Sequence, residues 1–385
     1  MTTSERATAA LAVAAATALV VALASPVATA VIGLILFGTL AVLLELRYLV
    51  GRLPVIARRD VVSGLAVLLA GTSLLRLAEH LFGAQARRAE AVLGFCVVAL
   101  VARVGLHGRR RIAAYVVAGL LAAASLVWPD HYAFALLHLH QLVVLVFVWD
   151  WAARLPRARE RRLFRGVQLA WGLLLPAVVL AGAVDTWLTG DPGIVRSVVG
   201  DGRSLVAAAA LPGDASGVLG LRLLTVYAFL QTMQLLVWVA FMPRFATEES
   251  ARFEDRFPYL TGARVWAVGF IAAAVFAVVF ALGFRQGQVL FGALWSWAVH
   301  LEMAAALVVV AAGRRTRGFT RLTLVPSLPE ESSDSGGTKG AQDPVDPGTP
   351  DADAAGLGRA GGGGHGSVAA PLPATAVAPE AEVGG

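Results

Sequence analysis

WPDHYAFALLHLHQLVVLVFVWDW, residues 128–151, is a stretch long and apolar enough to cross a lipid bilayer, yet it carries three histidines and a glutamine. A hydrocarbon core of about 30 Å needs about 20 helical residues at 1.5 Å each. At about 100° per residue, His131, His138 and Gln141 fall on one helix face, and His140 points the opposite way. Because polar groups are costly in lipid, the three-residue stripe is predicted to face protein or a water-filled cavity.

The composition places the whole chain in the same class as this stretch. It is 57% hydrophobic and only 15% charged, whereas soluble proteins have about 25% charged residues. The predicted fold class is therefore all-α: a polytopic membrane helix bundle of about ten transmembrane helices with a disordered C-terminal tail. The lipid bilayer is the expected partner, and no nucleic acid is expected. Cys96, the single cysteine, lies in an apolar run and is expected to be a buried free thiol, with no disulfide or cysteine-based zinc site in one chain.

The start of the chain admits two interpretations. Residues 28–30, Ala-Thr-Ala, resemble a signal-peptide cleavage site, which would remove residues 1–30. The apolar run resumes at once through Leu46, so two membrane helices that turn at Ser25-Pro26 are favoured. Eight further spans are predicted at 61–82, 91–106, 112–128, 131–151, 167–188, 218–242, 264–282 and 289–312, of which the one at 91–106 is short for a bilayer.

The distribution of arginine orients the predicted spans. Segments that follow even-numbered spans are rich in arginine, as at 47–59, 109–111 and 154–165, and the alternate segments are poorer. By the positive-inside rule, the protein is predicted to lie in the cytoplasmic (inner) membrane with both termini in the cytoplasm.

Two domains are predicted, a transmembrane helical domain (1–321) and a disordered, acidic, Pro/Gly-rich cytoplasmic tail (322–385). The tail contains nine acidic residues and only two basic ones, and it lacks hydrophobic periodicity. Short helices are expected at 204–211 in an outer loop and at 247–257 on the inner membrane surface.

Polar residues recur inside other spans. Arg76, Glu79 and His80 share one face of the third span, and Gln231 and Gln234 share one face of the eighth. Arg76 and Glu79 can simply neutralise each other, and the glutamines can simply join helices by hydrogen bonds. In the tenth span Ser296 and His300 lie on one side and Glu302 on the other, so this helix is predicted to be central.

Three functional hypotheses follow from these residues. The first is a membrane-embedded enzyme with a zinc, iron, copper or haem site in the outer half of the bilayer, because imidazole and carboxylate groups bind these cofactors. In it His138 and His300 approach one another. The predicted metal ligands are His80, His138, His300, Glu79 and Glu302, in a pocket lined by Arg76, His131, Gln141, Gln231, Gln234 and Ser296.

The second hypothesis is a proton-coupled transporter or ion pathway, with His131, His138, His300 and Glu302 as a titratable ladder. The third is a non-catalytic membrane scaffold whose acidic tail binds a cytoplasmic partner. No HExxH or CxxCH motif is present to decide between them.

Overall fold

A computed structural model describes residues 3–213 and 217–312, and within these ranges the chain is helical with no strand. The predicted tail at 322–385 lies outside the described residues. The all-helical prediction is therefore confirmed for the part of the chain that the structure describes.

Nine helices in the described ranges are long and apolar enough to cross a membrane. Three of these nine helices contain a short π-helical segment, so each is listed with the α-helical parts before and after that segment. The nine follow in chain order. They are α1 (Thr3–Ala24); α2, η1 and α3 (Pro26–Gly33, Leu34–Gly38, Thr39–Arg52); α4 (Arg59–Leu77); α7 (Arg109–Val127); α8 (Pro129–Ala152); α9, η3 and α10 (Ala158–Leu169, Ala170–Leu174, Leu175–Leu180); α13, η6 and α14 (Val218–Leu236, Val237–Phe241, Met242–Phe245); α16 (Gly262–Leu282); and α17 (Phe284–Ala312).

The predicted span at 91–106 corresponds to α6 (Ala84–Gly105), which is as long as the others but less apolar. Its first turns carry Arg87, Arg88 and Glu90, so it is not among the nine. Ten long helices are thus present in the described ranges, nine of which fit a membrane by length and composition.

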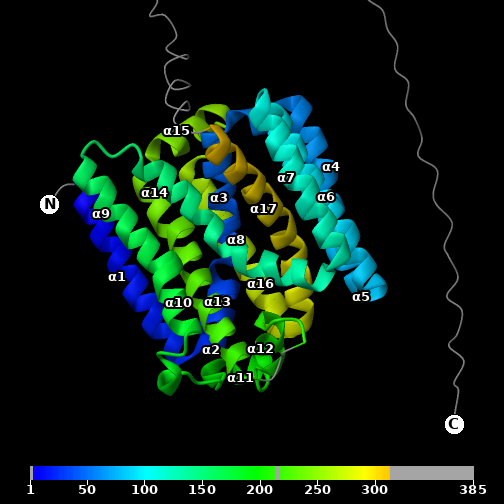
Figure 1. The fold of residues 1–385 in the computed structure, drawn as a ribbon, viewed down its shortest axis with the longest axis vertical. Coiled ribbons are helices and arrows are strands. Elements are labelled where there is room, and N and C mark those ends of the chain that lie inside the picture. Colours follow the sequence, from blue (N-terminus) through cyan, green and yellow to red (C-terminus); the bar gives the residue numbers. More distant parts are fainter. Residues whose placement is uncertain (1–2, 214–216, 313–385) are drawn as a thin grey trace, which may run out of the picture. The chain divides into compact units, whose positions relative to one another are not determined.

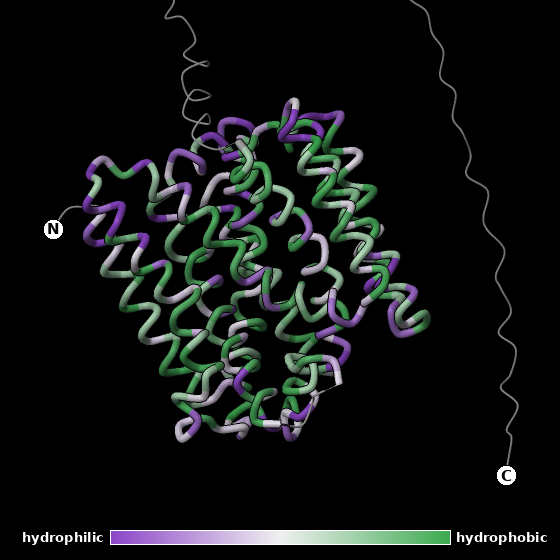
Figure 2. The backbone as a smooth tube through the Cα atoms, in the orientation of Figure 1, coloured by the Kyte–Doolittle hydropathy of each residue, from purple (hydrophilic) through white to green (hydrophobic). Residues whose placement is uncertain are grey.

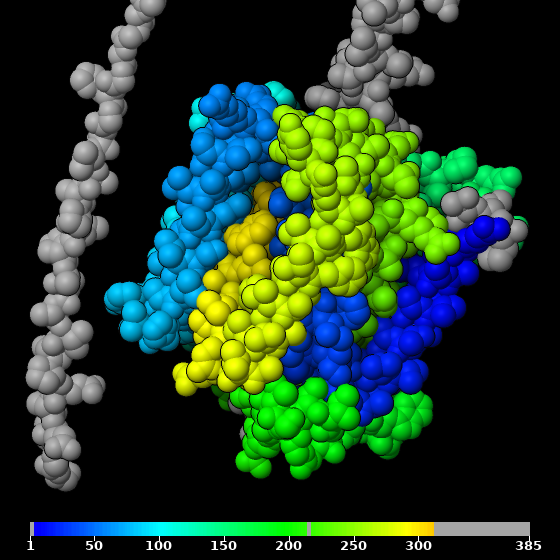
Figure 3. Space-filling view, turned by 180° about the vertical axis from the view of Figure 1, so that it is seen from behind, coloured from blue at the N-terminus to red at the C-terminus, as the bar shows by residue number. Residues whose placement is uncertain are grey.

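α8, α13 and α17 lie toward the centre of the bundle. α8 packs against α13 and α17, and α17 also contacts α3, α4 and α6. Figure 1 shows α4, α6 and α7 together on one side and α1 and α9 on the other. From behind, α17 is visible between α4 and α16 (Figure 3). The prediction that the tenth span is central agrees with this packing.

Proline accounts for two of the π-helical segments. Pro176 is near the start of α10, directly after η3, and Pro243 is near the start of α14, directly after η6. Proline lacks an N–H group and its ring crowds the preceding turn, so the helix widens locally instead of ending. Each of these two long helices therefore has an irregular turn in its second half.

The shorter helices cap the two ends of the bundle. In Figure 2 the long helices are mostly apolar and hydrophilic residues gather toward their ends. The helices predicted at 204–211 and 247–257 are confirmed as α12 (Arg203–Ala209) and α15 (Thr247–Arg256). Cys96 is exposed on α6, so its predicted burial is wrong. The remaining short elements are η2 (Pro54–Ala57), α5 (Glu79–Phe82), η4 (Asp185–Trp187), η5 (Gly193–Val195) and α11 (Arg196–Val199).

Candidate functional site

The rotation of α8 differs from the sequence prediction. Its most buried face runs through Leu136, His140, Val144 and Phe147, and His131 is exposed. This face packs against α13 and α17, which supply polar partners for the imidazole. Of the stripe predicted to face protein or a water-filled cavity, Gln141 is buried, His138 is half-buried and His131 is exposed.

A buried polar cluster joins α8, α13 and α17 around His140. Its Nδ1 lies 2.9 Å from Oε2 of Glu302, and its Nε2 lies 2.8 Å from Nε2 of Gln234. Gln234 also donates to Oε2 of Glu302 over 3.4 Å. The side chains of His140 and Glu302 are 3% and 0% exposed. We call His140, Gln234, Glu302 and Glu45 the central cluster.

The hydrogen bonds fix the state of the imidazole in the central cluster. An amide nitrogen can only donate, so Nε2 of His140 accepts from Gln234. The ring proton is then on Nδ1, which lies 2.9 Å from Oε2 of Glu302 in a geometry that makes no hydrogen bond. His140 is thus placed to exchange a proton with a carboxylate inside the bundle.

Glu45 brings a second carboxyl group to the central cluster from α3. It is 4% exposed, and it is close enough to Glu302 for their charges to interact. Oε1 of Glu302 has no hydrogen-bond partner among the described residues. Two carboxylates in the same buried region repel each other when both are charged.

A second group of polar side chains, a chain of ion pairs, joins α4, α5 and α6. Arg87 contacts Oε1 of Glu79 at 2.8 Å, and Oε2 of Glu79 contacts Arg76 at 2.9 Å. Arg76 contacts Glu90 at 3.0 Å, and Ser296 donates to the same oxygen of Glu90 over 2.6 Å. We call Arg87, Glu79, Arg76, Glu90 and Ser296 the outer network.

His300 extends the outer network. Its Nδ1 lies 2.6 Å from the carbonyl oxygen of Ser296, so that nitrogen donates and Nε2 accepts from the hydroxyl of Tyr132, 2.8 Å away. The imidazole is 3% exposed. Polar contacts therefore continue from Arg87 to Tyr132, whereas Glu302 lies on the other side of α17, and no hydrogen bond among the described residues joins the two groups.

An aromatic layer lies on the other side of the central cluster. The rings of Tyr48, Phe147 and Trp238 have centroids 5.5 Å to 5.9 Å apart, and all three side chains are buried. Each follows a residue of the central cluster on its own helix, Tyr48 three positions after Glu45 and Trp238 four after Gln234. The layer therefore borders the cluster on the side toward which α3, α8 and α13 run.

The predicted metal ligands are divided among different surroundings. Glu302 belongs to the central cluster and Glu79 to the outer network. His300 is hydrogen-bonded to Tyr132 and to the carbonyl oxygen of Ser296. His138 is half-buried, with Nδ1 3.1 Å from the carbonyl oxygen of Phe134, and His80 is exposed. Within residues 3–213 and 217–312, no three His, Cys, Asp or Glu side chains are arranged to hold a metal ion.

The predicted pocket residues are likewise divided. Arg76 and Ser296 join the outer network, and Gln234 joins the central cluster. Gln141 is buried, and Gln231 is buried with its amide donating to the carbonyl oxygen of Ala30 over 3.4 Å.

The outer network, Tyr132, His300 and the central cluster are together called the polar path. Five of its residues were missed by sequence reasoning: His140, Glu45, Arg87, Glu90 and Tyr132. Glu45 stands in the run LLELR near the end of a predicted span, which was a sufficient signal for a buried carboxylate. Glu90 lies directly before the predicted start of its span, and the helix in fact begins six residues earlier.

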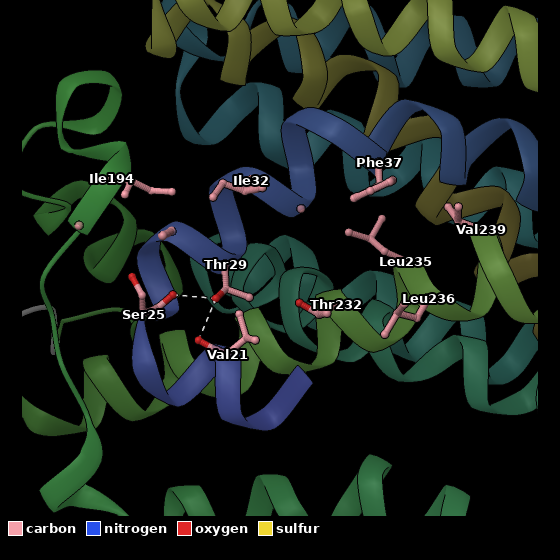
Figure 4. Close-up of a pocket in the computed structure, with 13 residues that line it drawn as sticks. Val21, Ser25, Thr29, Ile32, Phe37, Ile194, Thr232, Leu235, Leu236 and Val239 are labelled. Atoms are coloured by element: carbon pink, nitrogen blue, oxygen red, sulfur yellow. Dashed lines mark hydrogen bonds between the residues drawn. The ribbon is translucent and has the colours of Figure 1, made fainter. Parts of the chain in front are cut away.

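An apolar groove is also present, apart from the polar path. It has a volume of about 530 Å³ and lies between α1, α2, η1 and α13, with Ile194 at one end and Val239 at the other (Figure 4). The polar side chains that line it are the hydroxyls of Ser25, Thr29 and Thr232. It contains no titratable group that proton or metal chemistry requires.

Comparison of the chain with protein-family models, with curated proteins and with solved structures gives no match. The function is therefore inferred from the geometry of the polar path.

Proposed function

We propose that this chain is a multi-pass protein of the cytoplasmic membrane that moves protons through its helix bundle, alone or coupled to a solute. Nine helices of membrane length support the location. The alternation of arginine-rich and arginine-poor loops supports an orientation with both termini in the cytoplasm.

The observation that carries the proposal is the contact between His140 and Glu302. Both groups can take up and release a proton, and both are buried where water cannot exchange freely with them. A buried imidazole and carboxylate are expensive to maintain for stability alone, because hydrophobic residues of similar volume are often as stable or more so. A proton-binding role accounts for the presence of this buried pair.

A second series of polar contacts supports a path instead of an isolated site. Each step from Arg87 to Ser296 is a contact of 2.6 Å to 3.0 Å, and His300 and Tyr132 extend the series without a direct contact to His140. Proton relays in membrane proteins consist of such series of Asp, Glu and His residues. Arginines in the series hold the carboxylates in place and cannot themselves release a proton.

The metal- or haem-dependent enzyme has less support than proton movement. Its ligands would be His80, His138, His300, Glu79 and Glu302, and the structure places His80 at the surface and His138 against Phe134 and Tyr227. In the scaffold hypothesis the buried polar groups only hold the helices together, a role that hydrophobic residues of similar volume often fill as well or better.

Purified protein reconstituted into liposomes with a trapped pH-sensitive dye tests the proposal. An imposed pH gradient with valinomycin to balance charge is expected to dissipate faster than in empty liposomes. Glu302→Gln is expected to reduce that rate at least tenfold. Asp201→Asn, at an exposed position in an outer loop, serves as the control and is expected to retain it. A wild-type rate equal to that of empty liposomes, with and without candidate solutes, would contradict the proposal.

A further inference from the structure

A second group of buried charges lies beyond the aromatic layer, at the ends of α3 and α8. Arg52 contacts both carboxylate oxygens of Asp150, at 2.9 Å and 3.1 Å. Arg154 contacts Asp150 at 2.8 Å and also pairs with Glu249 of α15. Burial alone would lower the pKa of Arg154, but Glu249, Tyr48 and Asp150 raise it above its usual range. The arginine is therefore always charged.

α15 covers this group closely. Its backbone at Glu249 packs against Gly51 of α3, where an added Cβ would overlap the Glu249 carbonyl oxygen. Arg47 pairs with Glu254, and Arg256 donates to the carbonyl oxygens at positions 54 and 57. As a result the Glu249 side chain is only 1% exposed, although it belongs to a short, strongly charged helix.

Two buried oxygen atoms in this region lack partners. The hydroxyl of Tyr48 and Oε2 of Glu249 have no hydrogen bond among the described residues. The two side chains are close enough to interact electrostatically. An unpaired buried polar atom is destabilising, so such a pair is suited to hold a proton or a bridging water between them.

Tyr48 also borders the central cluster. It lies three residues after Glu45 on the same side of α3, and residues at this spacing are neighbours on a helix surface. Tyr48 thus has a carboxyl group on either side, Glu45 toward the middle of the bundle and Glu249 beneath α15.

We propose that Tyr48 and Glu249 form an inner proton-exchange site, through which protons pass between the central cluster and the cytoplasm. This inference rests on the proposed function. A proton from Glu45 bonds to the Tyr48 oxygen, directly or through water, while the original Tyr48 O–H bond breaks and its proton passes to Oε2 of Glu249. The phenol ends unchanged, and Glu249 then releases the proton to water. Arg154 favours this release because it stabilises the ionised carboxylate.

The groups that face Glu249 define what each variant removes. They are Tyr48 on α3 and Arg154 after α8, and Arg154 is in turn held by Asp150, which pairs with Arg52. Tyr48→Phe removes the hydroxyl and leaves the contacts among Arg154, Asp150 and Glu249 intact. Glu249→Gln removes the proton acceptor but also the ion pair, so it does not by itself separate relay from structure.

Proton flux into liposomes is to be measured for Tyr48→Phe, Glu249→Gln and Glu249→Asp. Both removals are expected to reduce flux at least tenfold, and Glu249→Asp is expected to retain a larger part of it. Glu248→Gln is the matched control, because Glu248 is the preceding residue of α15 and its side chain is 68% exposed. Circular dichroism and gel filtration before reconstitution show whether each variant is folded.

The outcomes separate this inference from the proposed function. Flux that is lost in Glu302→Gln but unchanged in Tyr48→Phe would overturn the inner site and leave the proposed function standing. An equal loss in Glu248→Gln and Glu249→Gln would also overturn it. Absence of flux in the wild-type protein would overturn both.

Discussion

Gly94 of α6 lies directly against the imidazole of His300 on α17, and a Cβ at this position would overlap ring carbons and Nε2. Because Gly94 has no side chain, α6 can approach α17 closely at His300. The contact makes a glycine in one helix a determinant of where a histidine in another helix lies.

Gly94→Ala is expected to displace His300 and break its hydrogen bond with Tyr132, reducing proton flux at least tenfold. Gly119 of α7 offers a matched control, since a Cβ there would meet no atom within 4 Å. Gly119→Ala is expected to keep normal flux and to gain about 0.5–1 kcal/mol of helix stability. Equal flux in the two variants would show that the position of His300 is unimportant.

The buried pair of His140 and Glu302 predicts a non-additive effect on stability. His140→Leu leaves Glu302 without its imidazole partner in a buried site, so the free energy of unfolding is expected to fall by about 3–5 kcal/mol. His140→Leu combined with Glu302→Leu is expected to recover most of this loss. Unfolding in mixed detergent micelles measures both, and a double variant as unstable as the sum of its parts would argue against a direct interaction.

The orientation predicted from the arginine distribution implies opposite results for topology reporters on the two sides of the membrane. Fusions after Gly193, in the segment between α10 and α13, and after Gly348, in the C-terminal region, are expected to report the outer and the cytoplasmic side, respectively. If both report the same side, the number of spans between them is wrong by one or another odd number.

A pH dependence of stability is expected from the loop after α10. Hydrogen bonds from Arg222 hold the pKa of Asp185 below its usual value of about 3.9. Because the folded-state pKa is lowered, the stabilisation is complete above the usual pKa and is lost as the pH falls through the folded-state value. Melting temperatures of wild type and Asp185→Asn are therefore expected to differ at neutral pH and to converge in acid. A difference that stays constant down to about pH 2 would exclude this linkage.

Hydropathy and charge were sufficient to predict the helices but not their rotation. The polar residues of α8 lie on opposite faces of a mostly apolar helix, so its sequence carries no strong periodicity to indicate which side faces the bundle. Three polar residues on one face suggested a buried stripe, whereas the packing against α13 and α17 selects the face of His140. Partners on other helices decide such a choice, and their pairing is not encoded in local spacing.

Part of the polar path was predictable from the cost of burying charge. Glu302, His300 and Gln234 were identified on that basis, and the structure places Gln234 and Glu302 in one cluster. Glu45 met the same criterion and was overlooked near the end of its span. The role of Gly94 was not predictable, since it depends on where α17 crosses α6.

The aromatic layer of Tyr48, Phe147 and Trp238 has an electrical consequence. Packed rings polarise less than the charged and polar groups on either side of them, so in the proton path proposed above a membrane potential would fall more steeply across this layer than across its neighbours. Moving one elementary charge through the full potential changes its free energy by about 2.3 kcal/mol per 100 mV. In that proposed path, the step past the Tyr48 hydroxyl would depend on voltage more strongly than the steps before and after it.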